Sequence, residues 1–122
     1  MSSLDQPAVA HLLDRLYAEA HTNDQRLMPR VRAATAERGG PFDDQAMAPL
    51  LDEAFMEVAP EVGRLLYLLT RARRPLLAVE FGTSFGLSTI HLAAALRDNG
   101  QGRLITTELN PRKAARATEH LR

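Results

Sequence analysis

The sequence predicts an α/β fold in which a helical segment precedes a doubly wound parallel sheet. Two observations carry this prediction. An apolar run at residues 76–79 enters a turn between Gly82 and Gly86 and continues as a helix, and a second strand-like run at residues 103–107 leads into Glu108. This order of strand, glycine turn, helix, strand and acid is typical of sheets that bind a ligand at their carboxyl edge.

The first half of the chain is expected to be helical. One helix begins after Asp5 and is expected to break at residues 21–24, where polar residues gather, and a second covers residues 25–38. The Gly-Gly-Pro run at residues 39–41 is a helix stop, because glycine ends a helix easily and proline cannot continue it.

Two more helices are expected before the sheet. The third runs from Asp43 through Phe55. The fourth begins at Pro60, where the missing N–H of proline costs nothing, and it stops before Pro75. Its apolar residues recur with a helical period and predict a buried stripe made of Val62, Leu65, Leu66 and Leu69.

From residue 76 the pattern changes to that of a sheet. The continuous apolar run predicts a parallel strand buried on both faces. A helix is expected over residues 86–98 and a last helix after the cap and proline at residues 110–111. We therefore divide the chain into an N-terminal helical region, residues 1–74, and the start of a sheet domain with its first two strands, residues 75–122.

Composition excludes several functional classes. Fifteen basic residues balance fifteen acidic ones, so no global charge favours nucleic acid or an anionic membrane. The chain has no cysteine, which excludes disulfides, thiolate metal sites and a cysteine nucleophile. No apolar run approaches the roughly 20 residues of a membrane span. We expect a cytoplasmic protein that binds neither nucleic acid nor membrane.

The glycine turn indicates what the sheet edge binds. A helix that starts directly after a strand directs its free N–H groups into the crevice at the carboxyl edge, where they attract a carboxylate or phosphate. Gly82 lets a ligand approach the backbone, and Ser88 adds a hydroxyl in the first turn of the helix. Glu108 is placed to accept both hydroxyls of a ribose. Glu80 adds a second negative charge beside the site.

These features favour a nucleoside that carries an amino acid. A phosphate-binding loop rarely has an acid such as Glu80 beside it, because the two anions repel each other. The spacing Gly82-x-x-x-Gly86 is not the G-x-G-x-x-G dinucleotide pattern, and no Walker lysine follows Gly86. A ligand with a cationic group and a carboxylate fits better, and S-adenosyl-L-methionine is the common ligand of that kind.

The segment Val79-Glu80-Phe81-Gly82-Thr83-Ser84-Phe85-Gly86-Leu87-Ser88 resembles the first motif of the class I S-adenosylmethionine-dependent O-methyltransferases. It is most similar to the catechol and caffeoyl-CoA O-methyltransferase group, which favours E-x-G-x-x-x-G-x-S. The run at residues 107–111 resembles that group's acidic strand end, and residues 58–66 resemble the segment before its first strand. The resemblance covers about residues 45–122 and implies a Rossmann-like fold.

The resemblance also implies roles for single residues. Val58 and Thr83 would line the methionine end of the ligand, and Gly82 would bring backbone close to its amino acid part. Glu80 would offset the ammonium group and Ser88 would bond the carboxylate, while Glu108 would bind the ribose. In complete enzymes of this family the acceptor is a small molecule with a hydroxyl group, and a divalent metal such as Mg²⁺ often orients it. The resemblance places metal ligands and catalytic base after the second strand, so we assign none here.

Other readings stay open at this point. Two strands leave open sheet edges, so the chain is expected to form a homodimer, and a catalytically inactive oligomerisation or interaction module is the alternative function. A nucleotide- or NAD-linked enzyme of the same fold is a second alternative. The histidines lack metal-ligand spacing, and His91 is expected to pack against an apolar helix face and not to act as a base.

Overall fold

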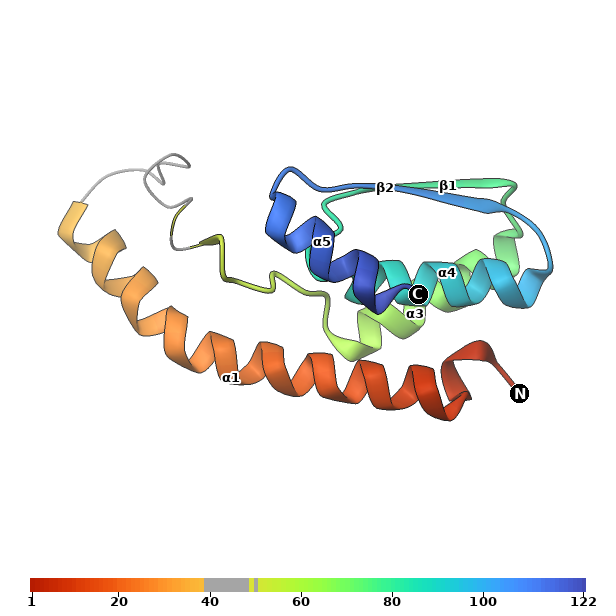
Figure 1. The fold of residues 1–122 in the computed structure, drawn as a ribbon, viewed down its shortest axis with the longest axis horizontal. Coiled ribbons are helices and arrows are strands. Elements are labelled where there is room, and N and C mark those ends of the chain that lie inside the picture. Colours follow the sequence, from red (N-terminus) through yellow and green to blue (C-terminus); the bar gives the residue numbers. More distant parts are fainter. Residues whose placement is uncertain (39–48, 50) are drawn as a thin grey trace.

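The computed structural model describes residues 1–38, 49 and 51–122. The elements follow the chain as η1 (Ser3–Asp5), α1 (Pro7–Arg38), α3 (Pro60–Arg73), β1 (Leu77–Phe81), α4 (Leu87–Asn99), β2 (Arg103–Thr107) and α5 (Pro111–His120). The two strands form one layer, α3, α4 and α5 lie on one side of it, and α1 extends along the far side of these helices (Figure 1). The α/β fold with a helical segment before its first two strands is confirmed.

The two strands pair in parallel, as the strand–helix–strand order predicts. Their register joins Leu77 to Arg103 and Phe81 to Thr107. Helix α4 connects them. It begins after Gly86, whose φ is +93°, and it ends before Gly100, whose φ is +67°. Both backbone conformations suit glycine and fix where the connecting helix starts and stops.

Only one face of the sheet is covered within the described part of the chain. Side chains alternate along both strands, and those nearer the helices are half-buried. The outer face is exposed and largely apolar: Val79 is 53% exposed and Phe81 86% exposed. Its apolar members are Leu77, Val79, Phe81 and Ile105, and the exposed Arg103 and Thr107 of β2 complete it. The prediction of a strand buried on both faces is therefore wrong for this structure.

Helix α1 runs without interruption through residues 21–24, so the predicted break there is wrong. Polar residues such as asparagine and aspartate lower helix propensity by less than about 1 kcal/mol each, which tertiary contacts outweigh. Thr22 donates its hydroxyl to the carbonyl of Ala18, one turn earlier in the same helix. Asn23 donates to the carbonyl of Glu53, which ties this part of the helix to the rest of the chain.

Helix α3 begins at Pro60 as predicted, but it buries a different face. Three residues of the predicted stripe, namely Val62, Leu65 and Leu69, are exposed. The buried residues of α3 are Gly63 and Thr70, two turns apart. Because Gly63 has no side chain, the helix can approach His91 of α4 closely, so close packing and not apolar area decides which face is covered.

The helix predicted over residues 43–55 lies largely outside the described residues. Pro49 and Leu51 are helical, whereas Ala54 and Phe55 are buried in a non-helical segment that leads to α3. The main apolar cluster forms where this segment meets the first half of α1 and the start of α4. Its buried members are Leu13, Leu16, Ala20, Phe55, Phe85, Leu87 and Ile90.

Candidate functional site

The glycine turn bends sharply at the carboxyl ends of the two strands. The backbone N–H groups of Gly82 and Thr83 both donate to the carbonyl of Thr107 at 2.9 Å, which fastens the turn to the end of β2. Gly82 has a φ of +87°, and a Cβ added to it would meet no atom within 4 Å. The space beside Gly82 is therefore open to a ligand, and glycine is required by the backbone conformation.

Glu80 is held beneath this turn by three hydroxyl groups. Ser88 donates to Oε1 at 2.5 Å, and Thr89 and Thr106 donate to Oε2 at 2.6 and 2.7 Å. The sequence-predicted residues Glu80 and Ser88 are thus brought together, but as partners of each other.

Glu108 follows β2 and is fixed by backbone N–H groups on both of its oxygens. Ser84 donates to Oε2 at 2.7 Å and Asn110 donates to Oε1 at 2.9 Å. Burial raises the pKa of Glu108, but the hydrogen bonds from Asn110 and Ser84 and the charge of Lys113 outweigh it, so the pKa lies below its ordinary value. Glu108 is therefore ionised at neutral pH, and each oxygen keeps a further lone pair for a ligand.

A hollow of about 600 Å³ opens beside Glu108. Its walls come from the segment at residues 51–56, from the end of β2 and from the start of α5, and include Leu51, Asp52, Met56, Glu108, Leu109, Asn110 and Lys113. Met56 and Leu109 are strongly exposed apolar side chains. An ionised carboxylate beside exposed apolar side chains suits a ligand that has both hydroxyl groups and an apolar ring.

The remaining predicted residues take supporting positions. Thr83 is buried, and its hydroxyl bonds to that of Thr106 and donates to the carbonyl of Thr107 at 3.1 Å. Val58 is half-buried just before α3, and in the described part of the chain its side chain, which is apolar, forms no hydrogen bond to the other predicted residues. Of the six predicted residues, Glu108 alone lines the hollow of 600 Å³.

Sequence reasoning missed two residues that act on Glu108, one through a hydrogen bond and one through its charge. Ser84 bonds to it through its backbone, and Lys113 is only 7% exposed and donates to the carbonyl of Leu51 at 3.1 Å. Burial lowers the pKa of Lys113, while the charges of Glu108 and Asp52 act in the opposite direction. A lysine in the first turn of a helix is unfavourable for the helix dipole, and this was the available signal for Lys113.

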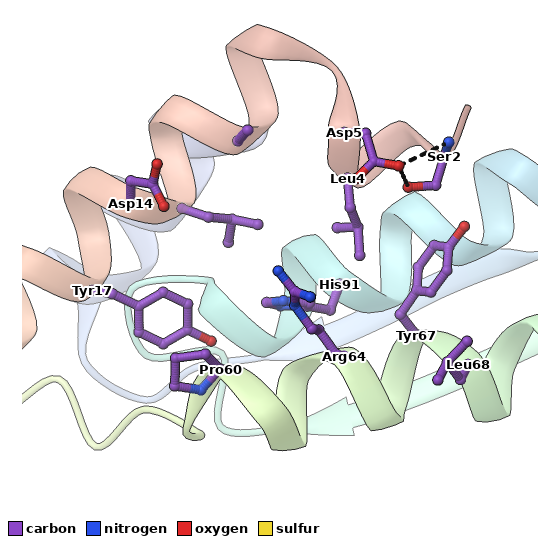
Figure 2. Close-up of a pocket in the computed structure, with 12 residues that line it drawn as sticks. Ser2, Leu4, Asp5, Asp14, Tyr17, Pro60, Arg64, Tyr67, Leu68 and His91 are labelled. Carbon is purple, nitrogen blue, oxygen red and sulfur yellow. Dashed lines mark hydrogen bonds between the residues drawn. The ribbon is translucent and has the colours of Figure 1, made fainter.

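His91 lies away from Glu108, in a cleft of about 660 Å³ between the N-terminal turns of the chain, α3 and α4. Figure 2 shows Tyr17, Arg64 and His91 around this cleft. His91 is 3% exposed and its Nδ1 lies 2.8 Å from the carbonyl of Leu87. Burial and, secondarily, the charge of Arg64 lower its pKa. The prediction of a packed histidine is confirmed.

Two further properties concern the chain as far as it is described. No group of three or more histidine, aspartate or glutamate side chains there could hold a metal ion. The acids of the site do not converge, since Glu80 faces three hydroxyls and Glu108 faces two N–H groups. None of the helices in this part of the chain is long and apolar enough to cross a membrane.

Comparison with known proteins gives two findings. A family model described as a methyltransferase domain matches residues 79–122, which include the glycine turn, Glu80 and Glu108. A protein from Niastella koreensis named catechol O-methyltransferase is 41% identical over 66 residues, which are 54% of this chain. The match covers 29% of the length of that relative.

Proposed function

We propose that this chain, whose residues 79–122 match a model of a methyltransferase domain, binds S-adenosyl-L-methionine at the carboxyl ends of β1 and β2. The observation that carries the proposal is the position of the Glu108 carboxylate. Its ionised carboxylate stands at the end of β2, fixed by two N–H groups and open to a hollow of about 600 Å³. A carboxylate with two free lone pairs at a strand end is suited to the two hydroxyls of a ribose.

The chemistry of the other residues fits the same ligand. The open space at Gly82 admits the amino acid part of the ligand close to the backbone. Glu80 supplies a negative charge for its ammonium group, and Thr83, Ser88 and Val58 complete the proposed site. Since the hydroxyls of Thr83 and Ser88 are already bonded within the protein, we assign them first to holding the turn and Glu80 in place.

The proposed activity is methyl transfer to a hydroxyl group of a small molecule. S-adenosyl-L-methionine, when bound, would supply a sulfonium methyl group for transfer to an acceptor oxygen, with cleavage of the carbon–sulfur bond, release of S-adenosylhomocysteine and loss of the hydroxyl proton to solvent. The contribution of these residues is to bind and orient the donor, a positioning effect that can lower a barrier by several kcal/mol. We assign no catalytic base among the described residues. We also derive no step through a metal, because no three of their acidic or histidine side chains come together in a group that could hold one.

Calorimetric titration with S-adenosylhomocysteine, the product form of the donor, tests the binding proposal. Glu108→Ala is expected to weaken binding by about 1–3 kcal/mol, or roughly 5- to 150-fold, because charge-assisted hydrogen bonds are lost. Glu119→Ala is the matched control, since Glu119 is exposed on α5. Unchanged affinity in a folded Glu108→Ala variant, or tighter binding of NAD at the same site, would contradict the proposal.

We also propose that the chain self-associates as a homodimer. Self-association is the form that its alternative function, as an interaction module, would take. The supporting observation is the exposed apolar outer face of the sheet, where Val79 stands opposite Ile105. The formal net charge is zero, so copies of the chain repel each other little. Light scattering after gel filtration should show a dimer that Val79→Lys converts to a monomer and that the exposed control Thr118→Lys does not. A monomeric wild type at high concentration would contradict this role.

A cytoplasmic location is part of the proposal. The sequence has no cysteine and therefore forms no disulfide that would need an oxidising compartment. Fractionation of cells that produce the protein, followed by detection of the chain in each fraction, tests this location. Recovery of the chain outside the cytoplasmic fraction would contradict it.

A further inference from the structure

Ser84 occupies a strained position in the glycine turn. Its φ is +49°, in the left-handed region that non-glycine residues seldom adopt. It lies between Gly82 and Gly86, whose φ values are also positive. In this conformation the backbone N–H of Ser84 points at Glu108 and donates to Oε2 at 2.7 Å. A strained residue persists only where its surroundings hold it, so the contacts of Ser84 need an explanation.

The side chain of Ser84 supplies that restraint. Its hydroxyl donates to the backbone carbonyl of Phe55, which belongs to the non-helical segment before α3. Phe55 is itself immobilised, because its ring is buried and lies 4.2 Å from the ring of Phe85, centroid to centroid. The acceptor of the Ser84 hydroxyl is therefore a fixed point in the apolar cluster.

The same segment is fastened to helix α1 on its other side. Asn23 donates to the carbonyl of Glu53, and Arg26 forms an ion pair with the Glu53 carboxylate at 2.6 Å. A continuous series of contacts thus leads from α1 through the segment at residues 53–55 and through Ser84 to the carboxylate of Glu108. This arrangement gives the N-terminal helix a connection to the proposed ligand site.

We infer that Ser84 is a positioning residue for Glu108: its hydroxyl, bound to the Phe55 carbonyl, holds the left-handed backbone that directs the Ser84 N–H at the carboxylate. With Ser84 on Oε2 and Asn110 on Oε1, the carboxylate is restrained at both oxygens, and each oxygen keeps a lone pair for a hydroxyl of the ligand. A carboxylate fixed in this way suits two hydroxyls on adjacent carbons. The identity of the ligand in this inference rests on the proposed function, whereas the geometry of Ser84 and Glu108 does not.

Ser84→Ala tests the inference because it removes the hydroxyl and keeps the strain. We expect the pKa of Glu108, followed by NMR of its side-chain carboxyl carbon, to rise measurably, and the affinity for S-adenosylhomocysteine to fall about three- to tenfold. Ser84→Gly should recover part of both, since glycine adopts a positive φ without strain. Thr118→Ala, which removes an exposed hydroxyl on α5, should leave the pKa of Glu108 unchanged.

The outcomes separate the two claims. A shifted Glu108 pKa without any ligand binding would sustain the role of Ser84 and overturn the proposed function. Normal ligand binding with an unshifted pKa in folded Ser84→Ala would overturn the role of Ser84. If Ser84→Ala does not fold, a pH titration of the wild-type protein followed by NMR replaces it. The chemical shift of the Ser84 amide proton should change as Glu108 titrates, and a shift that does not respond would overturn the inference.

Discussion

The hydroxyl of Ser88 lies 2.5 Å from Oε1 of Glu80 and donates a hydrogen bond to it across the start of helix α4. Thr89 and Thr106 occupy the other oxygen of the same carboxylate. Among the described residues, the Glu80 carboxylate accepts hydrogen bonds from three hydroxyl groups and forms no ion pair with an arginine.

Glu80→Gln should weaken binding of S-adenosylhomocysteine by about 1–2 kcal/mol, because the negative charge beside the ligand's ammonium is removed. The same variant should bind 5′-methylthioadenosine, which has no amino acid part, as the wild type does. Glu108→Ala should weaken both ligands. Calorimetric titration of the two ligands checks this, and equal losses for both in Glu80→Gln would remove Glu80 from the ammonium subsite.

Ser88→Ala should lower the free energy of unfolding by about 1–2 kcal/mol, since a hydrogen bond to a charged, half-buried carboxylate is lost. Chemical denaturation measures the loss. Thr22→Ala is the control: Thr22 also donates its hydroxyl, but to a backbone carbonyl on the exposed side of α1, so its removal should cost less. Equal stability of Ser88→Ala and wild type would show that the Ser88 hydroxyl is dispensable for holding Glu80.

Gly63→Ala should destabilise the protein by about 1–3 kcal/mol through overpacking. A Cβ at residue 63 would lie 2.6–2.9 Å from three atoms of the His91 ring, which is itself buried and bonded to Leu87. The clash outweighs the gain of up to about 1 kcal/mol from replacing glycine in a helix.

A double-mutant cycle of Gly63→Ala with His91→Ala isolates this contact. Once the ring is removed, Gly63→Ala should become neutral or stabilising. Thermal denaturation of the four proteins gives the coupling energy. Additive effects would show that Gly63 is needed for a reason other than the close approach of the imidazole.

Asp98 should make the attachment of the N-terminus sensitive to acid. It accepts hydrogen bonds from Ser3 and from the Tyr67 hydroxyl. Burial raises its pKa, but the bonds from Ser3 and Tyr67 outweigh this and lower the pKa from 3.8 to about 2. Because the folded-state pKa is depressed, the stabilisation is fully present above pH 3.8 and is lost as the pH falls through about 2.

Asp98→Asn should therefore lower the free energy of unfolding by about 1–2 kcal/mol near neutral pH, after allowance for solvent screening. Near pH 2 the loss should be much smaller. Denaturation at a series of pH values measures the difference from wild type. Asp14→Asn serves as the control, since Asp14 is exposed on α1. A cost that stays constant from pH 7 to pH 2 would contradict the assignment to the Asp98 charge.

The elements around the glycine turn were predictable because their signals are local. Pro60, Gly86 and Asn110 act at helix ends through their own backbone or side-chain chemistry, and each does so in the structure. The position of Glu108 at the end of β2 follows from the strand itself. These rules need no knowledge of tertiary contacts, so they apply to a sequence directly.

The errors arise where tertiary contacts decide. Nothing local to residues 21–24 reveals that Asn23 will bond to Glu53, thirty residues away. Likewise, the apolar spacing of α3 identifies Leu65 and Leu69 as a stripe but cannot say that Gly63 packs on His91 instead. The link from Ser84 to Phe55 and Glu108 joins three separate segments, so no sequence pattern announces it.

NMR mapping with S-adenosylhomocysteine on the isotopically labelled chain tests the central claim most directly. We predict saturable shifts of the backbone amides of Gly82, Ser84 and Glu108, with little change at Tyr17 and His91, which line the other cleft. Shifts that gather around His91, or none at saturating ligand in a folded protein, would contradict the binding of an S-adenosylmethionine-type ligand at the carboxyl ends of β1 and β2.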